Sequence, residues 1–404
     1  MMAAHIAGLS LDTLRITAKT EWHMLRIIDG DGRIGHGEAT LNGESGTLRS
    51  VARSRFPDLI GRPAQAAILA TSGPPRTLAE AAILSALDMA LLDLEAQAAG
   101  RPLHAHLSEP QDEPRGEPSA GPEDRTARRD VRLYANINRR SEARTPASFA
   151  ESALLAMGSG FDVFKLAPFD EVTVERCRSE PFASLMQPAF ARIAAVREAI
   201  GPAGVLRIDC HWRFTGDAAR YVIDRAADFA IDWVECPLPE MPGTAGDIAA
   251  LRRRAERRGI RLAGLENGIG AGAFRPFLEA RAYDVIMPDV KYFGSLRALV
   301  AFCREVREAG ASLSLHNPSG PVAHAASLHV AVCLDENVHH EVQFAETPLF
   351  AEITSAPEAV ALRGSVHPPD RGPGLGIALD NERIAQRFDP NHSFSIGAPT
   401  SPMQ

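Results

Sequence analysis

Five short apolar runs in the middle of the chain each end in a carboxylate or a histidine, residue types that bind metals and transfer protons. The runs are VLRIDCHW, WVECP, LAGLENG, VIMPD and SLSLHN, and the residues are Asp209, Glu235, Glu266, Asp289 and His316. They recur about every 25 to 30 residues, the length of one strand-and-helix unit in a parallel barrel. Because such barrels carry their chemistry at the C-terminal ends of the strands, the series predicts one divided metal and proton-transfer site. The alternative is five unrelated surface charges.

Asp209, Glu235 and Glu266 end three successive predicted strands. Three carboxylates that face one point suit a hard divalent cation such as Mg²⁺, and no soft ligand belongs to this set. Without a metal, the three acids would repel one another and raise each other's pKa. Each acid alone is equally well explained as a solvated loop carboxylate or a helix N-cap, but together they predict a metal site.

Asp289 and His316 end consecutive predicted strands, so their side chains can meet. A carboxylate held against one ring nitrogen fixes the tautomer and leaves the other nitrogen as a general base. A buried ion pair without a catalytic role is the alternative. Because His316 opens the turn-rich HNPSGP loop, we favour the dyad.

Three further residues are candidates for the same cavity. His211 lies two residues after Asp209, and residues i and i+2 of a strand face the same side, so its imidazole is a candidate proton donor to a leaving group. A packed structural imidazole is the alternative. Lys165, in FKLAPF, can orient a substrate carboxylate or act as a base with a depressed pKa. Glu341, in VHHEVQF, can hydrogen-bond a substrate carboxylate while protonated, or can be a simple rim acid.

The elements that must position these residues alternate between strands and helices. Eight strand signals extend from about Val131 to Glu346, which predicts an α/β fold with a closed (β/α)8-type TIM barrel over residues 131–362. No G-x-G-x-x-G follows the first of them, which argues against a dinucleotide fold.

Three other segments surround the barrel. Residues 1–108 predict an α+β module: 13–28 alternate before the turn DGDGR and the segment IGHGEAT, and 78–98 have helical spacing. Residues 109–130 are rich in Pro, Gly and charge and predict an exposed linker or loop. The tail at 363–404 is expected to fold back onto the first module.

Composition sets limits on function. At 404 residues, with 45% hydrophobic and 23% charged residues, the chain is typical of globular proteins. Its net charge of -8 argues against a nucleic-acid partner, and the basic run RRRAERR at 252–258 is expected to be a solvated helix face. The five cysteines lack a CxxC pair, which favours reduced thiols. With no membrane-length apolar stretch and no signal peptide pattern, we expect a cytoplasmic protein with no membrane partner, and a homo-oligomer.

The motifs as a set resemble the enolase superfamily, in its mandelate racemase-like subgroup, over nearly the whole chain. GHGEAT and AILSALDMALLDLEAQAAGRPL are similar to the N-terminal α+β capping domain of that family, and PGLGI is similar to its C-terminal return. IDCHW, VECP, LENG, MPDVKYFG and HNPSGPVAHAASLH are similar to its modified, enolase-like barrel. The resemblance implies that Asp209, Glu235 and Glu266 bind Mg²⁺ and that Asp289 with His316 is the base dyad.

The activity that the resemblance implies is abstraction of a proton α to a carboxylate, with the resulting charge stabilised by the metal. Racemases of this subgroup use two lysines separated by one residue on the second strand, and Ala167 breaks that pair here. GFDVFKLAPFDE, IDCHW and HNPSGPV resemble instead the acid-sugar dehydratases of the galactonate type. In that case His316 removes the α-proton and His211 protonates the departing β-hydroxyl to give a 2-keto-3-deoxy acid. Cys236, where the family more often has a second glutamate, is a departure.

Two other functions stay open at this point. One is an epimerase, racemase or cycloisomerase of a hydroxy acid that uses His316 and Lys165. The other is a barrel that binds an acid ligand without turning it over.

Overall fold

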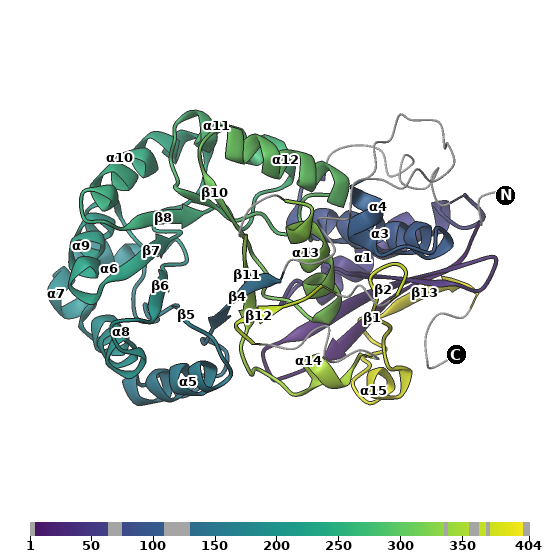
Figure 1. Cartoon of the computed structure of the whole chain (residues 1–404), viewed down its shortest axis with the longest axis horizontal. Coiled ribbons are helices and arrows are strands. Elements are labelled where there is room, and N and C mark those ends of the chain that lie inside the picture. Colours follow the sequence, from purple (N-terminus) through teal and green to yellow (C-terminus); the bar gives the residue numbers. More distant parts are fainter. Residues whose placement is uncertain are drawn as a thin grey trace.

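The computed structural model describes residues 5–63, 75–108, 130–334, 338–354, 363–368 and 372–398. The linker predicted at 109–130 lies outside these residues, except for Asp130. Figure 1 shows a barrel surrounded by an arc of helices, with a smaller module against the side of the barrel where its first and last strands meet.

The smaller module is built on an antiparallel sheet with the strand order β13-β1-β2-β3. Its strands are β1 (Ile6–Arg15), β2 (Glu21–Asp29), β3 (Ile34–Glu38) and β13 (Phe394–Gly397). The alternating pattern predicted at 13–28 is split by a turn, because the Thr17 hydroxyl accepts hydrogen bonds from the backbone N–H groups of Lys19 and Thr20. Since β13 pairs with β1, the end of the chain returns to this module.

One long helix covers the sheet, at very close approach to β3. The helix α3 (Leu78–Ala98) begins where the Thr77 side chain accepts a hydrogen bond from the backbone of Glu80. A Cβ atom added at Gly35 would lie 2.1 Å from the carbonyl oxygen of Ala90, and one at Gly37 would lie 2.0 Å from that of Ala86. The two glycines of GHGEAT therefore let the sheet touch the helix backbone. The other elements here are α1 (Ser45–Arg55), η1 (Phe56–Asp58) and α4 (Leu103–Leu107).

The barrel has eight parallel strands, as predicted, and it closes because β11 pairs with β4. The strands are β4 (Val131–Asn136), β5 (Val163–Leu166), β6 (Val205–Asp209), β7 (Ile231–Glu235), β8 (Arg261–Gly264), β9 (Val285–Ile286), β10 (Ser312–Leu315) and β11 (His339–Gln343). The two-residue strand β12 (Ser365–Val366) adds to β4. Each barrel strand thus coincides with a strand signal in the sequence.

Helices surround the strands and bury an apolar layer between the two. They are α5 (Pro146–Gly158), α6 (Val174–Ser179), α7 (Phe182–Leu185), α8 (Gln187–Ile200), α9 (Gly216–Ala226), η2 (Ala227–Phe229), η3 (Pro242–Thr244), α10 (Ala245–Glu256), α11 (Gly270–Glu279), α12 (Leu296–Glu308) and α13 (Pro321–Val332). Two short helices follow the last barrel strand, α14 (Leu349–Glu352) and α15 (Asn381–Ala385), and α15 lies beside the smaller module (Figure 1).

Large side chains fill the barrel interior below its C-terminal end. Tyr134 and Trp233 meet edge to face in a cluster with Val163, Ala263 and Met287. The buried guanidinium of Arg207 lies 3.6 Å from the centre of the Trp233 ring. The interior of the barrel is therefore filled by side chains, and the polar side chains at the C-terminal strand ends lie on top of this packed layer.

Glu38, the acid of GHGEAT, joins the two halves of the molecule. Its buried carboxylate accepts hydrogen bonds from the backbone N–H groups of Gly320 (2.6 Å) and Ala323 (2.9 Å), at the beginning of α13. It therefore caps the helix that follows the His316 loop.

Replacing Glu38 with alanine should lower the free energy of unfolding by about 1 to 3 kcal/mol, because buried backbone donors would lose their acceptor. The shift of the urea midpoint measures this loss. Glu44→Ala is the matched control, since Glu44 is an exposed N-cap of α1 whose side chain makes no capping hydrogen bond. An equal shift in the two variants would contradict the assignment.

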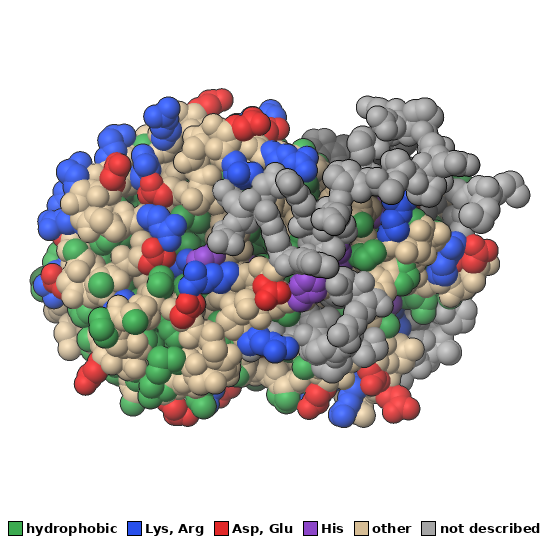
Figure 2. Space-filling view, in the orientation of Figure 1, with side chains coloured by type: hydrophobic (Ala, Val, Ile, Leu, Met, Phe, Trp, Pro, Cys, Tyr) green, Lys and Arg blue, Asp and Glu red, His purple; other side chains and the backbone are tan. Residues whose placement is uncertain are grey.

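The surface of the barrel carries charges of both signs. Figure 2 shows blue and red side chains interspersed over the barrel helices on the visible face. Within the run RRRAERR, Arg252 is paired with Asp284, and Arg254 and Arg258 with Asp224. These arginines thus have acidic partners on the helix surface. Among the described residues, none of the helices combines the length and the apolar character that a membrane crossing requires.

Candidate active site

The predicted residues converge at the C-terminal end of the barrel. Asp209 and Glu235 are the last residues of β6 and β7 and are directly paired in the strand register. Glu266 lies just beyond β8, and Lys165 and Glu341 lie within β5 and β11. The site is therefore assembled from the C-terminal ends of successive barrel strands, and closure of the barrel through β4 brings β11 near β5.

The ammonium group of Lys165 lies in the middle of the acids. Its Nζ atom is 2.6 Å from Oε1 of Glu235, 2.8 Å from Oε1 of Glu341 and 3.8 Å from Oδ2 of Asp209. Burial of the lysine opposes its charge, but Glu235 and Glu341 outweigh this and raise the pKa of Lys165 well above its usual value. In this structure the surrounding carboxylates therefore favour the charged ammonium form of Lys165, and its role as a base stays a prediction.

The surroundings of Glu341 favour its ionised form, whereas the suggested hydrogen bond to a substrate carboxylate requires the protonated form. Burial alone would raise its pKa, but Lys165 and His316 lower the pKa of Glu341 to about 2. The amide of Asn136 donates a further hydrogen bond of 2.7 Å to Oε1. Glu341 is thus an anionic partner of Lys165 in this structure.

Asp289 and His316 meet as the strand order predicts. Nδ1 of His316 lies 2.9 Å from Oδ2 of Asp289, while Nε2 lies 3.3 Å from Oε2 of Glu266 and 3.8 Å from Oε2 of Glu341. Burial of Asp289 is outweighed by Lys291 and by His316, so the pKa of Asp289 is lowered. An ionised Asp289 fixes the Nδ1–H tautomer of His316 and leaves Nε2 facing the acids.

His211 reaches the site by a turn and not by the extended strand expected from its position two residues after Asp209. The strand β6 ends at Asp209, and His211 has a φ of 45°. Its Nε2 atom nevertheless lies 2.9 Å from Oδ2 of Asp209, and the charge of Asp209 raises the pKa of His211. The side chain is 41% exposed, so the imidazole lies at the open side of the acid cluster.

The donor set fits a divalent cation, with two differences from the prediction. Oxygen atoms of Glu235 and Glu266 and the sulfur of Cys236 lie within 4.8 Å of one another. Asp209 does not belong to this set, and its Oδ2 atom lies 2.9 Å from Nε2 of His211 and 3.8 Å from Nζ of Lys165. The set includes a thiol, although the predicted ligands were oxygen atoms alone.

Burial disfavours the ionised forms of Glu235 and Glu266 when no cation is bound. Burial raises the pKa of Glu235 to about 8, although the Lys165 ammonium opposes this shift. Burial, together with the charges of Asp209 and Glu235, raises the pKa of Glu266 well above its usual range. A cation such as Mg²⁺ would stabilise the ionised form of both groups.

Three further residues, which were not predicted from the sequence, contact the site residues. Lys291 forms a buried ion pair with Asp289, the indole of Trp233 donates to Oε2 of Glu235 at 3.0 Å, and Asn136 binds Glu341. Asn136 ends the first barrel strand, but the rule that selected the five run-ending residues required a carboxylate or a histidine and so passed over an amide. Trp233 lies two residues before Glu235 in β7, so strand alternation places both side chains on the same face. Lys291 lies two residues after Asp289, beyond β9, where only the turn shows which way its side chain points.

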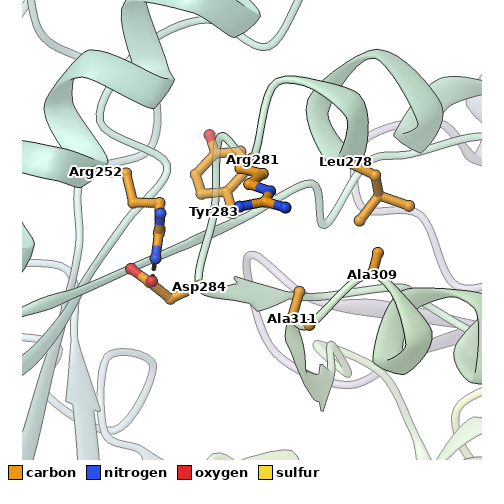
Figure 3. Close-up of a pocket in the computed structure, with 8 residues that line it drawn as sticks. Arg252, Leu278, Arg281, Tyr283, Asp284, Ala309 and Ala311 are labelled. Carbon is orange, nitrogen blue, oxygen red and sulfur yellow. Dashed lines mark hydrogen bonds and ion pairs between the residues drawn. The ribbon is translucent and has the colours of Figure 1, made fainter.

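A separate pocket of about 250 Å³ lies at the opposite end of the strands. Its lining includes Tyr283 and Asp284, just before β9, and Ala311, just before β10 (Figure 3). Arg252 is paired there with Asp284. None of the predicted site residues lines this pocket.

Known proteins are similar to this chain in both sequence and fold. Residues 148–383 match the family described as Enolase C-terminal domain-like, and residues 11–107 match the N-terminal domain of the mandelate racemase and muconate lactonizing enzyme family. D-gluconate dehydratase of Thermoproteus tenax is 27% identical over 376 residues, which cover 90% of this chain and 69% of that protein. D-galactonate dehydratase of Ralstonia pickettii (strain 12J) is 23% identical over 391 residues, which cover 93% of each.

A solved structure gives the same arrangement of elements. It is a member of the enolase superfamily from Salmonella Typhimurium, with a TM-score of 0.79 and 20% sequence identity. The similarity covers 97% of this chain and 100% of that one. At this identity the likeness shows the fold.

Proposed function

Because the chain belongs to the mandelate racemase and muconate lactonizing enzyme family of the enolase superfamily, we propose that it is a Mg²⁺-dependent dehydratase of a sugar acid. The two sequence relatives named above are dehydratases of D-gluconate and D-galactonate. The observation that carries the proposal is the position of two imidazoles, His316 and His211, on the same cluster of acids.

His316 is assigned as the general base. Its Nδ1–H is held by Asp289, so the lone pair of Nε2 can accept the α-proton of the substrate. A divalent cation held by Asp209, Glu235 and Glu266 would stabilise the negative charge that develops on the substrate carboxylate. Without such stabilisation the α-proton is too weakly acidic for an imidazole to remove.

His211 is assigned as the general acid. As the β carbon–oxygen bond breaks, the imidazolium gives its proton to the departing hydroxyl, which leaves as water. The carboxylate of Asp209 favours the protonated form of His211 before this step. The enol that remains tautomerises: it gains a proton at the β-carbon, loses its hydroxyl proton to water and becomes a 2-keto-3-deoxy acid.

Lys165 and Glu341 form an ion pair, and we assign neither of them as a second catalytic base. Because Lys165 is held between Glu235 and Glu341, the epimerase alternative lacks a free second base in this structure. We assign the pair to balancing charge next to the metal ligands and to orienting the substrate carboxylate.

The test is a panel of aldonic and aldaric acids that includes D-gluconate and D-galactonate. With Mg²⁺ we expect a 2-keto-3-deoxy product from at least one acid, detected as its semicarbazone. Treatment with EDTA should abolish the reaction, and added Mg²⁺ should restore it.

Other outcomes would overturn the proposal. Deuterium from D₂O in recovered substrate without loss of water would indicate an epimerase. Tight Mg²⁺-dependent binding with complete retention of the α-hydrogen would indicate a binding protein.

A further inference from the structure

The carboxylate of Glu240 contacts the backbone turn next to each of the three predicted metal ligands. These turns contain Trp212, Cys236 and Leu265. Glu240, in the loop after β7, accepts hydrogen bonds at Oε2 from the indole of Trp212 (3.0 Å) and at Oε1 from the backbone N–H of Leu265 (2.7 Å). The thiol of Cys236 lies 3.7 Å from Oε1. Tyr283, which also lines the pocket in Figure 3, donates its hydroxyl to Oε1 at 2.7 Å.

These three turns have an unusual backbone. Trp212, Cys236 and Leu265 have φ values of 58°, 45° and 72°, in the left-handed region that residues with a side chain rarely adopt. Such a conformation costs about 1 to 3 kcal/mol and persists only where the surrounding structure holds it. Each of the three lies within three residues of Asp209, Glu235 or Glu266. Bonds to Glu240 therefore stabilise the backbone conformation that aims the ligands.

Glu240 lies on the outer side of the barrel wall, away from the substrate. Ala263 belongs to the cluster inside the barrel, so the next residue of β8, Gly264, faces the helices. A Cβ atom at Gly264 would lie 2.4 Å from Oε1 of Glu240 and 2.6 Å from Cζ of Tyr283. The glycine thus leaves the space in which this carboxylate and ring sit against the strand end.

The turns are also bonded to one another. The backbone N–H of Trp212 donates to the carbonyl of Cys236 at 2.7 Å, and that of Cys236 donates to the carbonyl of Ala263 at 3.0 Å. A shift of one turn would therefore move its neighbour. Glu240 is the side chain that contacts all three, so its loss should affect the ligands together.

We propose that Glu240 is a positioning residue that sets the geometry of the metal ligands and thereby the affinity for the divalent cation. This inference rests on the proposed function, because it takes Asp209, Glu235 and Glu266 as the ligands. Partners behind the ligands of a metal site characteristically change its affinity by about 10-fold to 100-fold when they are mutated.

The test compares Glu240→Gln with Trp212→Phe in the full-length protein. Glutamine keeps an oxygen that can accept from Leu265 and Tyr283, but its amide nitrogen cannot accept from the indole of Trp212. Trp212→Phe removes the donor of the same bond and leaves the carboxylate intact. Glu256→Gln, at the exposed end of α10, is the matched control.

The dissociation constants of Mg²⁺ and Mn²⁺ are measured by titration calorimetry, and the melting temperature of the metal-free protein is measured alongside. We expect Glu240→Gln to weaken binding by about 10-fold to 100-fold. Trp212→Phe should weaken binding in the same direction, and the double variant should be no weaker than Glu240→Gln alone, because both changes break one bond. The control should bind as the wild type does, and the metal-free melting temperature should change little in all variants.

Unchanged affinity in Glu240→Gln, while the wild-type protein binds the cation, would overturn this inference alone. If the wild-type protein binds neither cation, the metal assignment fails, and this inference fails with it. Weaker binding that is matched by a large fall in the metal-free melting temperature would show a general structural role and would also overturn the inference. Should Glu240→Gln not fold, Trp212→Phe decides the question in the same way.

Discussion

Replacing His316 with asparagine is expected to abolish both exchange of the α-proton with solvent and formation of the dehydrated product. The variant loses the only nitrogen of the Asp289 dyad that faces the acid cluster, Nε2, and so the group that accepts the α-proton. Removal of a general base characteristically lowers a rate by about 10² to 10⁴-fold. Exchange is followed by NMR in D₂O, and dehydration by the keto product.

A histidine outside the site provides the control for this variant. His106→Asn removes an imidazole that pairs with Glu95 in the N-terminal module, at 3.2 Å, and should leave both rates unchanged. Wild-type exchange in His316→Asn would assign the base to another group. Binding of Mg²⁺ should persist in His316→Asn, which separates loss of the base from loss of the metal site.

Replacing His211 with asparagine is expected to separate the two steps. The imidazole of His211 is needed to protonate the departing hydroxyl, whereas the α-proton is removed by His316 on the other part of the acid cluster. Dehydration should therefore fall by about 10² to 10⁴-fold, while solvent deuterium still appears at the α-carbon of recovered substrate. The ratio of the two rates in one D₂O reaction measures the effect.

His211 also contacts Asp209, a predicted metal ligand, so the affinity for Mg²⁺ has to be measured in the same variant. Equal loss of exchange and dehydration at saturating Mg²⁺ would contradict the assigned acid. Loss of exchange that is restored by additional Mg²⁺ would instead place His211 in support of the metal ligand.

Much of the fold and the location of the site followed from local patterns. Strand signals alternate with helical signals along the chain, and each of the eight predicted barrel strands is present. Since parallel strands in a barrel all end at the same face, residues that end successive strands must come together there. Asp209, Glu235 and His316 could therefore be assigned to one site before any distance was known.

The contacts between site residues could not be predicted in the same way. A protonated Glu341 and a lysine of depressed pKa were both reasonable for isolated buried groups, because burial disfavours charge. The two groups instead lie 2.8 Å apart and stabilise each other's charges. Likewise, the contact between His211 and Asp209 depends on a turn at His211, and strand periodicity does not predict this turn.

Glu38 and Glu240 illustrate the same limit. Glu38 is separated by 282 residues from the backbone N–H of Gly320 that it caps, and Glu240 by 25 residues from that of Leu265. Glu38 ends the strand β3, but IGHGE is not an apolar run, and Glu240 lies in a loop, so no hydrophobic periodicity singles out either acid. The role of each acid is set only by folding, which brings its carboxylate next to a backbone N–H group that needs an acceptor.

The sequence by itself determined the class of fold, the family and the face of the barrel that carries the chemistry, because hydrophobic periodicity and strand ends are local properties of the chain. Only the tertiary structure decided which charges neutralise one another. It placed Lys165 between Glu235 and Glu341, and it brought Cys236 into the donor set beside Glu266. The physical reason is that the energy of a buried charge depends on its distances to other charges, and those distances exist only across strands that are remote in the sequence.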